Sequence, residues 1–354
     1  MLKPIFIGIY TILLSSTPAW AVNHLPQHFQ HQDWEVACSN TGTCRAAGYN
    51  SDDDYQSPAS ILLTRQAGPQ QAIIAEVALS RLEDEENPVK NTTDIQFYLN
   101  GVSHGKVKIG QRDLPLMARL NSAQTQALIK FANQNVKIEF KSKDHQWQVS
   151  DKGMTSVLLK MDDLQKRIGT TGALTKKGNK SEKDVLQAQS MRTVKAIKTA
   201  TKPSKVVRQT DQAFSALQRR LLSHTTADTE CMSAKDINDN FKDENIEIYS
   251  LNQQKVVATT LCWQGAYNRG YGFWLMDKDL KSNIEMITDA GSEFTAGIID
   301  SAQKGRGIGD CWSVAQWVWN GQRFIQSIDR TTGMCKGFMG GIWDLDLIES
   351  KVLK

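Results

Sequence analysis

The sequence predicts a mainly β protein with two antiparallel, sandwich-like or barrel-like domains, a few short helices and a flexible basic linker between them. Short runs rich in β-branched and aromatic residues recur along the chain. In its second half, turn residues follow such runs about every eight to twelve positions, which is typical of antiparallel sandwiches and barrels. Residues 169–210 contain no aromatic residue and separate the two β-rich regions.

The first 21 residues, MLKPIFIGIYTILLSSTPAWA, have the pattern of a secretory signal peptide. One lysine precedes a short apolar run, and Ala19-Trp20-Ala21 resembles a cleavage site, so we expect a cut after Ala21. No later apolar run approaches the ~20 residues that a membrane-spanning helix needs. The sequence therefore predicts an exported protein, periplasmic or secreted, with no transmembrane segment in the mature chain.

Six cysteines follow the predicted cleavage site, an even number that indicates disulfides in an exported chain. Cys38 and Cys44 lie on either side of a turn and are expected to clamp a hairpin. A redox role for this pair is the alternative, but the pair lacks C-x-x-C spacing. We expect a second bond, Cys311–Cys335, at the base of a hairpin and assign Cys231–Cys262 by elimination.

Residues 22–168 are predicted to form the N-terminal domain. Alternation around Trp34, Val36 and Cys38 indicates a strand, and several further strands follow. One helix is expected after Asn121 or Ser122. A second carries apolar residues at Val157, Met161, Leu164 and Ile168, with Gly169 as its stop.

Residues 169–210 are predicted to be the flexible linker. Ten Lys or Arg residues and two acids fall between Lys176 and Arg208. A segment of this composition buries too little apolar surface to order itself, which favours a tether. Contact with an anionic envelope surface is the alternative interpretation. Export removes the protein from most nucleic acid, so no nucleic-acid partner is expected.

Residues 211–354 are predicted to form the C-terminal β domain with a short leading helix at 211–223. Strands at 313–319 and 323–328 flank Asn320-Gly321, a strong hairpin signal because both residues tolerate positive φ. Trp317 and Trp319 alternate with Val318 and are expected to share one face.

Four segments closely resemble an uncharacterised exported bacterial family, domain-of-unknown-function family 1176. They are FQHQDWEVACSNTGTCRAAGY near the N-terminus, then CWQGAYN, KGRGIGDCW and TTGMCKGFMGGIWDL. The resemblance implies an exported location and no particular chemistry. Residues 29–168 also resemble the invasion-associated locus B family, which implies a small periplasmic β-sandwich-like domain.

No catalytic residue set, cofactor motif or metal site is predicted. The chain from Thr225 onward contains no histidine, which excludes a Ser-His-Asp triad and a His-ligated zinc site there. Carboxylates are frequent in this half, and a glycosidase needs only two of them facing one cleft. Whether the protein is an enzyme is left open by the sequence, with a binding role favoured.

The candidate binding residues lie in and after the glycine-rich run 305–309. They are Lys304, Arg306, Asp310, Trp312, Lys336 and Trp343. Backbone amides of such a loop can form an anion-binding nest, completed by the three cations, although a structural turn beside a disulfide is the simpler interpretation. Tryptophan rings exposed beside Asp310 would be able to stack on a sugar, whereas most tryptophans are expected in the core.

The function predicted from sequence is therefore a non-catalytic binding or cell-envelope role in the periplasm. The candidate partners are a cell-wall glycan, an anionic envelope surface or another periplasmic protein. The alternative is a glycosidase-like, carboxylate-dependent hydrolase that acts on cell-wall glycan.

Overall fold

The protein is described by a computed structural model that covers residues 25–53, 56–81, 94–111, 114–225, 229, 231 and 244–353. These residues form strands β1 to β23 and helices α1 to α3. All of their sheets are open and antiparallel except one parallel pair, so the predicted mainly β fold class is confirmed. None of the described helices is long and apolar enough to cross a membrane. The predicted signal peptide, residues 1–21, lies outside the described residues.

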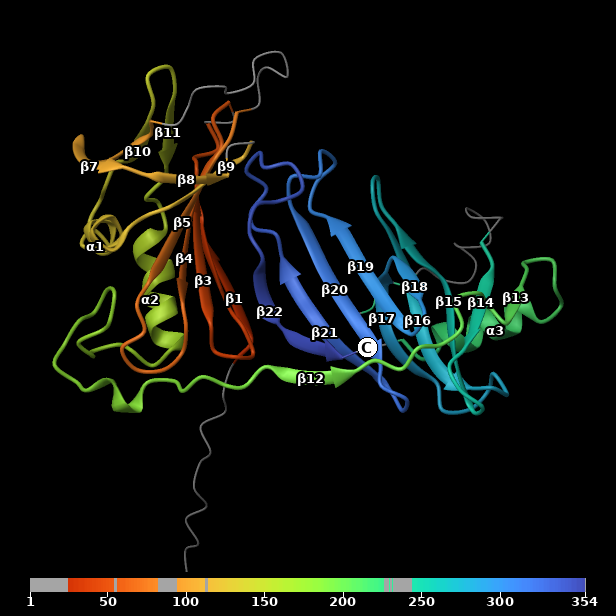
Figure 1. Ribbon diagram of the computed structural model, residues 1–354. Helices are drawn as coiled ribbons and strands as arrows, with labels where there is room; N and C mark the ends of the chain where they lie inside the picture. The colour runs from red at the N-terminus through yellow and green to blue at the C-terminus, as the bar shows by residue number, and fades with distance from the viewer. Residues whose placement is uncertain are drawn as a thin grey trace, which may run out of the picture.

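The N-terminal half, residues 25–168, contains two sheets and two helices (Figure 1). The first sheet has seven strands in the order β1 (Gln27–His31), β2 (Trp34–Cys38), β3 (Cys44–Tyr49), β4 (Ala59–Arg65), β5 (Ile74–Leu79), β9 (Leu116–Arg119), β8 (Lys108–Gln111). The second has the order β11 (Gln146–Val149), β10 (Ile138–Lys141), β6 (Gln96–Leu99), β7 (Val102–Lys106).

Both predicted N-terminal helices are present. Helix α1 (Ser122–Ile129) begins after Asn121, whose side chain accepts a hydrogen bond from the backbone amide of Gln124. Helix α2 (Met154–Leu164) is shorter than its apolar pattern predicts. Lys166 adopts a φ of 56°, and the amide of Arg167 bonds to the carbonyl of Asp162, so the helix ends before Ile168. The prediction that Gly169 stops this helix was therefore wrong by about one turn.

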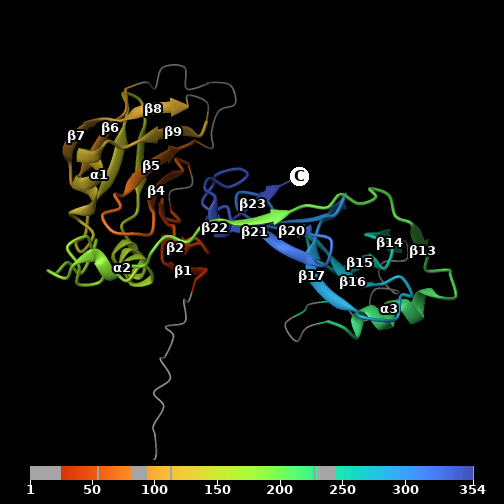
Figure 2. The same ribbon diagram turned by 60° about the horizontal axis from the view of Figure 1, so that its bottom comes forward.

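Alternation along β2 divides its side chains between two buried faces. Trp34 and Val36 pack into the N-terminal core, and Trp34 Nε1 donates to the carbonyl of Ser150 at 2.7 Å. Glu35 and Ala37 belong to the opposite face. The C-terminal half covers that face with Phe338, Trp343 and Leu345. The first sheet is therefore buried on both sides near β2, and in both ribbon views β22 lies beside it (Figures 1 and 2).

The C-terminal half, residues 205–353, packs two five-stranded sheets against one another. The first has the order β13 (Lys205–Val207), β14 (Ile246–Ser250), β15 (Lys255–Gln264), β16 (Arg269–Asp277), β17 (Glu285–Gly291). The second has the order β18 (Glu293–Thr295), β19 (Ile298–Lys304), β20 (Trp312–Trp319), β21 (Phe324–Thr331), β22 (Leu345–Ile348). Tyr249, Phe273 and Trp319 fill the space between the sheets. Helix α3 (Phe214–Leu222) covers the other face of the first sheet through Phe214 and Leu221.

The predicted hairpin of β20 and β21 is present, but its loop is longer than expected. Trp319 pairs with Phe324, so residues 320–323 form a four-residue connection rather than a two-residue Asn-Gly turn. The side chain of Asn320 accepts hydrogen bonds from the amides of Gln322 and Arg323 at 2.9 Å each. Gly321 alone takes a positive φ, 98°, so Asn320 acts through its side chain instead of its backbone.

Residues 169–210, predicted to be a flexible basic linker, make contacts with both halves. Glu182, in the 3-10 turn η1 (Glu182–Asp184), accepts a hydrogen bond from Arg167 at 3.0 Å. Strand β12 (Arg192–Lys195) pairs in parallel with β23 (Ser350–Leu353). Strand β13 lies within the predicted linker, and it forms an edge strand of the first C-terminal sheet. Figure 2 shows this segment running from α2 past β23 to β13.

Three disulfides are present, and they are the three pairs that the sequence predicts. Cys38–Cys44 closes the β2–β3 hairpin, with its Cα atoms 4.0 Å apart. Cys231–Cys262 joins the segment after α3 to β15. Cys311–Cys335 ties the start of β20 to the loop after β21, with a Cα separation of 4.8 Å. None of the described cysteines is free.

Candidate functional site

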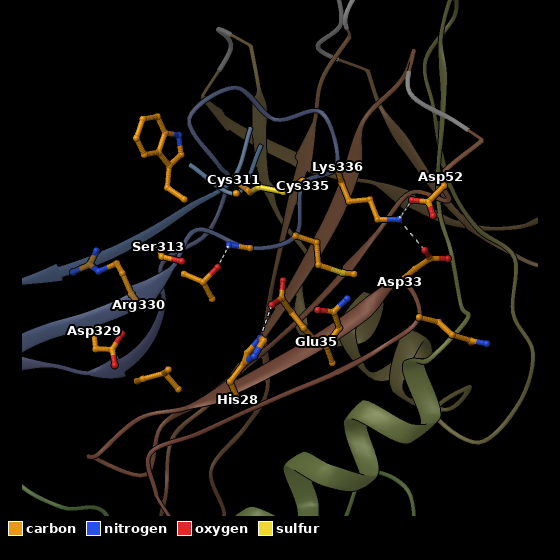
Figure 3. A pocket seen from close by; sticks show the side chains of 18 residues that line it. His28, Asp33, Glu35, Asp52, Cys311, Ser313, Asp329, Arg330, Cys335 and Lys336 are labelled. Atoms are coloured by element: carbon orange, nitrogen blue, oxygen red, sulfur yellow. Dashed lines mark hydrogen bonds and ion pairs between the residues drawn. A yellow bond between two sulfur atoms is a disulfide. The ribbon is translucent and has the colours of Figure 1, made fainter. Parts of the chain in front are cut away.

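A cleft of about 820 Å³ lies where the two halves meet (Figure 3). Its size is within the range of small-molecule sites, roughly 300–1,000 Å³. One wall is β1 with the turn into β2, which contributes His28, Gln30 and Gln32. The opposite wall is β20 and β21, which contribute Ser313, Asp329, Arg330 and Thr331. The Cys311–Cys335 disulfide and Lys336 close one end.

Glu35 enters the cleft from β2, and its carboxylate is held by two donors. His28 Nε2 lies 2.7 Å from Oε2, and the hydroxyl of Tyr49 donates to Oε1 at 2.6 Å. The Glu35 side chain is 3% exposed. Burial, together with the neighbouring charge of Glu35, raises the pKa of Tyr49 well above its usual value, so this hydroxyl stays protonated and remains a donor. Figure 3 shows His28 and Glu35 pointing toward one another.

Lys336 is buried between two carboxylates of the N-terminal half. Its Nζ donates to Asp33 Oδ1 at 2.8 Å and to Asp52 Oδ1 at 2.6 Å. Burial by itself would lower the pKa of Lys336, but the hydrogen bonds and charges of these two acids raise it. The same lysine holds the pKa of Asp52 below its usual value. Lys336 therefore remains charged and fixes this end of the cleft.

Asp329 differs from the other acids of the cleft because it has no ionic or hydrogen-bonding partner among the described residues. It lies on β21, half-buried, and burial raises the pKa of its carboxyl. Its neighbour Arg330 pairs instead with Asp344 at 2.7 Å and Asp346 at 3.1 Å. Asp329 is thus the cleft acid best suited to hold a proton or to meet a ligand.

The glycine-rich loop 305–309 encloses a carboxylate of the chain itself. Asp310 is fully buried and accepts hydrogen bonds from Arg306 Nε at 2.6 Å and from the amide of Gly337 at 2.7 Å. Burial would raise the pKa of Asp310, but these donors lower it. The loop supports the disulfide as a structural turn, since its arginine is already paired.

The remaining sequence-predicted residues do not form one binding site. Lys304 stacks over the ring of Trp312, with Nζ 5.4 Å from the ring centroid. Trp343 is 6% exposed and donates from Nε1 to Ser60 Oγ at 2.7 Å, inside the interface of the two halves. The three predicted cations therefore point to three different partners. Only Trp312 and Lys336 of the predicted binding residues line the cleft.

Sequence reasoning did not place the following ionisable residues in a binding site, although they line the cleft: His28, Asp33, Glu35, Asp52, Asp329 and Arg330. One signal was available, because Glu35 interrupts a strand whose neighbours are apolar on both sides. The side chains opposite each other across the cleft are separated by about 300 positions in the chain. No local pattern connects two positions so far apart.

Comparison with known proteins gives one family. A family described as "Protein of unknown function (DUF1176)" matches residues 28–348. The chain belongs to this family. The DUF1176 membership predicted from the four sequence segments is confirmed.

One curated relative extends the comparison over nearly the whole DUF1176 chain. "Uncharacterized protein YpfG" of Escherichia coli (strain K12) is 23% identical over 342 residues, 90% of this chain and 91% of that protein. No solved structure matches the chain significantly. The resemblance of residues 29–168 to the invasion-associated locus B family stays a prediction, since neither match concerns that family.

Proposed function

We propose that this DUF1176 protein is exported to the periplasm and is a non-catalytic binding protein whose cleft takes a glycan of the cell envelope. Export is supported by the signal-peptide pattern of residues 1–21 and by the three disulfides, which persist in oxidising compartments.

The observation that carries the proposal is the composition of the two facing walls of the cleft. Gln30 and Gln32 provide amides on one wall, and Ser313 and Thr331 provide hydroxyls on the other. The Glu35 carboxylate is held by His28 and Tyr49, and Lys336 is paired with Asp33 and Asp52. A groove lined by such amides, hydroxyls and hydrogen-bonded charged groups suits the many hydroxyl groups of a sugar chain.

A folded protein partner fits the same groove less well. Specific protein interfaces bury about 800 Å² on each partner and are centred on apolar and aromatic anchors. Most residues that line this cleft are polar, and its larger apolar side chains are Trp312, Met334 and Leu347. The concave polar shape therefore favours a sugar chain.

Titration calorimetry of the purified protein with soluble peptidoglycan fragments and N-acetylglucosamine oligomers tests the proposal. We expect Gln30→Ala to weaken binding by roughly tenfold, because one or two hydrogen bonds to the ligand are lost. The matched control Gln322→Ala changes an exposed glutamine in the β20–β21 loop and should bind as the wild type does. No heat of binding with any of these glycans, or equal loss in both variants, would overturn the proposal.

A second candidate function, glycoside hydrolysis, is favoured by one observation. Asp329 has a raised pKa and shares the cleft with the ionisable Glu35, and glycosidases use one protonated and one charged carboxyl group. An assay for new reducing ends tests this function. If it is correct, the wild type should release reducing ends from the glycan and Asp329→Asn should release none. Glycan binding by the wild type without release of reducing ends would support the non-catalytic binding role.

A further inference from the structure

A second cavity, of about 470 Å³, lies between the two sheets of the C-terminal half, away from the cleft. Strands β14, β15 and β16 form one side and β18 the other. The aromatic side chains of Tyr249, Tyr271, Phe273 and Phe294 line it. The rings of Tyr249 and Phe294 come from opposite sheets and approach to 4.7 Å between centroids. The cavity is therefore an aromatic space at the end of the sandwich core.

Strand pairing places an acid and a hydroxyl in one row of this cavity. Glu247 on β14 pairs with Thr259 on β15, and Thr259 pairs with Phe273 on β16. Directly paired residues of neighbouring antiparallel strands point to the same face of the sheet. All three line the cavity, so the carboxylate, the hydroxyl and the ring are presented to the same space.

The Thr259 hydroxyl has no hydrogen-bond partner among the described residues. Thr259 is 7% exposed, so its Oγ1 is shielded from bulk water as well. Leaving a buried hydroxyl without a partner costs folding free energy. A ligand that supplies an N–H group to Oγ1 would remove this cost.

The charge of the cavity has one sign. Glu244, Glu247 and Glu293 line it, and the described lining residues include no Lys, Arg or His. Arg269 pairs with Glu244 at 3.2 Å from outside the lining. Glu247 accepts a hydrogen bond from the Tyr249 hydroxyl at 2.5 Å, and Glu293 accepts one from Thr295 at 3.0 Å. Both of these carboxylates thus lack a cationic partner in the described part of the chain.

We propose that this cavity is a binding site for a small organic amine in its ammonium form. The ammonium group donates hydrogen bonds to Glu247 and to Thr259 Oγ1, and the faces of Tyr271 and Phe294 surround its charge and its aliphatic stem. A cation is attracted both by the carboxylates and by the negative faces of aromatic rings. An anion finds no cationic side chain among the described lining residues, whose donor side chains are the hydroxyls and the amide of Asn245.

Titration calorimetry with 1,5-diaminopentane at low ionic strength tests this site. Thr259→Val keeps the shape and removes the hydroxyl, and we expect it to weaken binding by about five- to tenfold. Glu247→Gln should weaken it by about tenfold or more, since an ion pair becomes a neutral contact. Glu285→Gln is the matched control, because Glu285 is exposed on β17 and does not line the cavity.

The comparison with tetramethylammonium separates the two parts of the site. This ion has the charge but no N–H donor, so we expect it to bind the wild type more weakly than the diamine does. We also expect it to bind Thr259→Val as tightly as it binds the wild type. An unfolding curve of each variant shows whether a loss of binding results from a loss of the folded state. The proposal is overturned if the wild type does not bind the diamine, or if folded Glu247→Gln and Glu285→Gln bind it equally.

Discussion

Lys336 Nζ donates to Asp33 Oδ1 across 2.8 Å, joining the loop after β21 to the turn before β2. The two residues are 303 positions apart, and their side chains are 5% and 12% exposed. This ion pair links the two halves of the protein beside the cleft.

We expect Lys336→Met to destabilise the protein by about 3 kcal/mol, because Asp33 is left as a buried, unpaired charge. Asp52 adds little to this loss, since its side chain is 77% exposed. Urea unfolding of the variant measures the change. Lys351→Met, at an exposed lysine of β23, is the control and should unfold as the wild type does. An unchanged midpoint for Lys336→Met would show that the pair does not join the halves.

We expect Gly48→Ala to destabilise the N-terminal half by about 3 kcal/mol. A Cβ at this position would lie 2.2 Å from the ring of Trp34, which is fully buried and cannot move aside. The thermal unfolding midpoint is the measurement. Gly265→Ala is the control, since its nearest neighbouring atom would be 4.0 Å away. Equal midpoints in the two variants would contradict the packing of Trp34 on β3.

We expect Asp329→Asn to raise stability at neutral pH. Burial raises the folded-state pKa of Asp329, so the stability that its protonated form contributes is fully present below the unfolded value of ~3.9 and is lost as pH rises through the folded pKa. The variant should melt higher than the wild type at pH 7 and together with it below about pH 4. Asp144→Asn, at an exposed acid, should show no such crossover. A difference that is constant with pH would mean that Asp329 is not the titrating group.

We expect the double variant Cys311→Ser/Cys335→Ser to lose about 3 kcal/mol, because the disulfide closes a loop of 24 residues. Lys336 and Gly337, whose amide binds Asp310, directly follow Cys335, so loss of the bond should also weaken glycan binding. Denaturant titration of the variant and of the wild type, both without a reducing agent, checks the first effect. Identical curves for the two proteins would show that this bond adds nothing to the fold.

Much of the fold follows from local patterns in the sequence. The hairpin closed by Cys38 and Cys44, the cap of α1 at Asn121 and the hairpin of β20 and β21 all depend on residues within about ten positions of one another. The Cys231–Cys262 bond is nonlocal, yet elimination was enough to pair it. These features are therefore readable from the chain alone.

The cleft was not predictable by the same means. Alternation shows that Glu35 and Ala37 face away from Trp34, but it does not show that Phe338, Trp343 and Leu345 cover that face. This cover buries Glu35 and places it opposite β21. The glycine-rich run 305–309 was a candidate anion-binding nest, with a structural turn as the simpler interpretation, and Arg306 and the Gly337 amide bind Asp310 instead of a ligand. Pairings over such distances depend on how the two halves dock.

Hydrogen–deuterium exchange with and without soluble peptidoglycan fragments tests the binding role of the cleft most directly. The account predicts slower exchange in residues 27–36 and 328–336, the two walls of the cleft, and no change in helix α3. Unchanged exchange in both walls at saturating glycan, or protection confined to other strands, would contradict it.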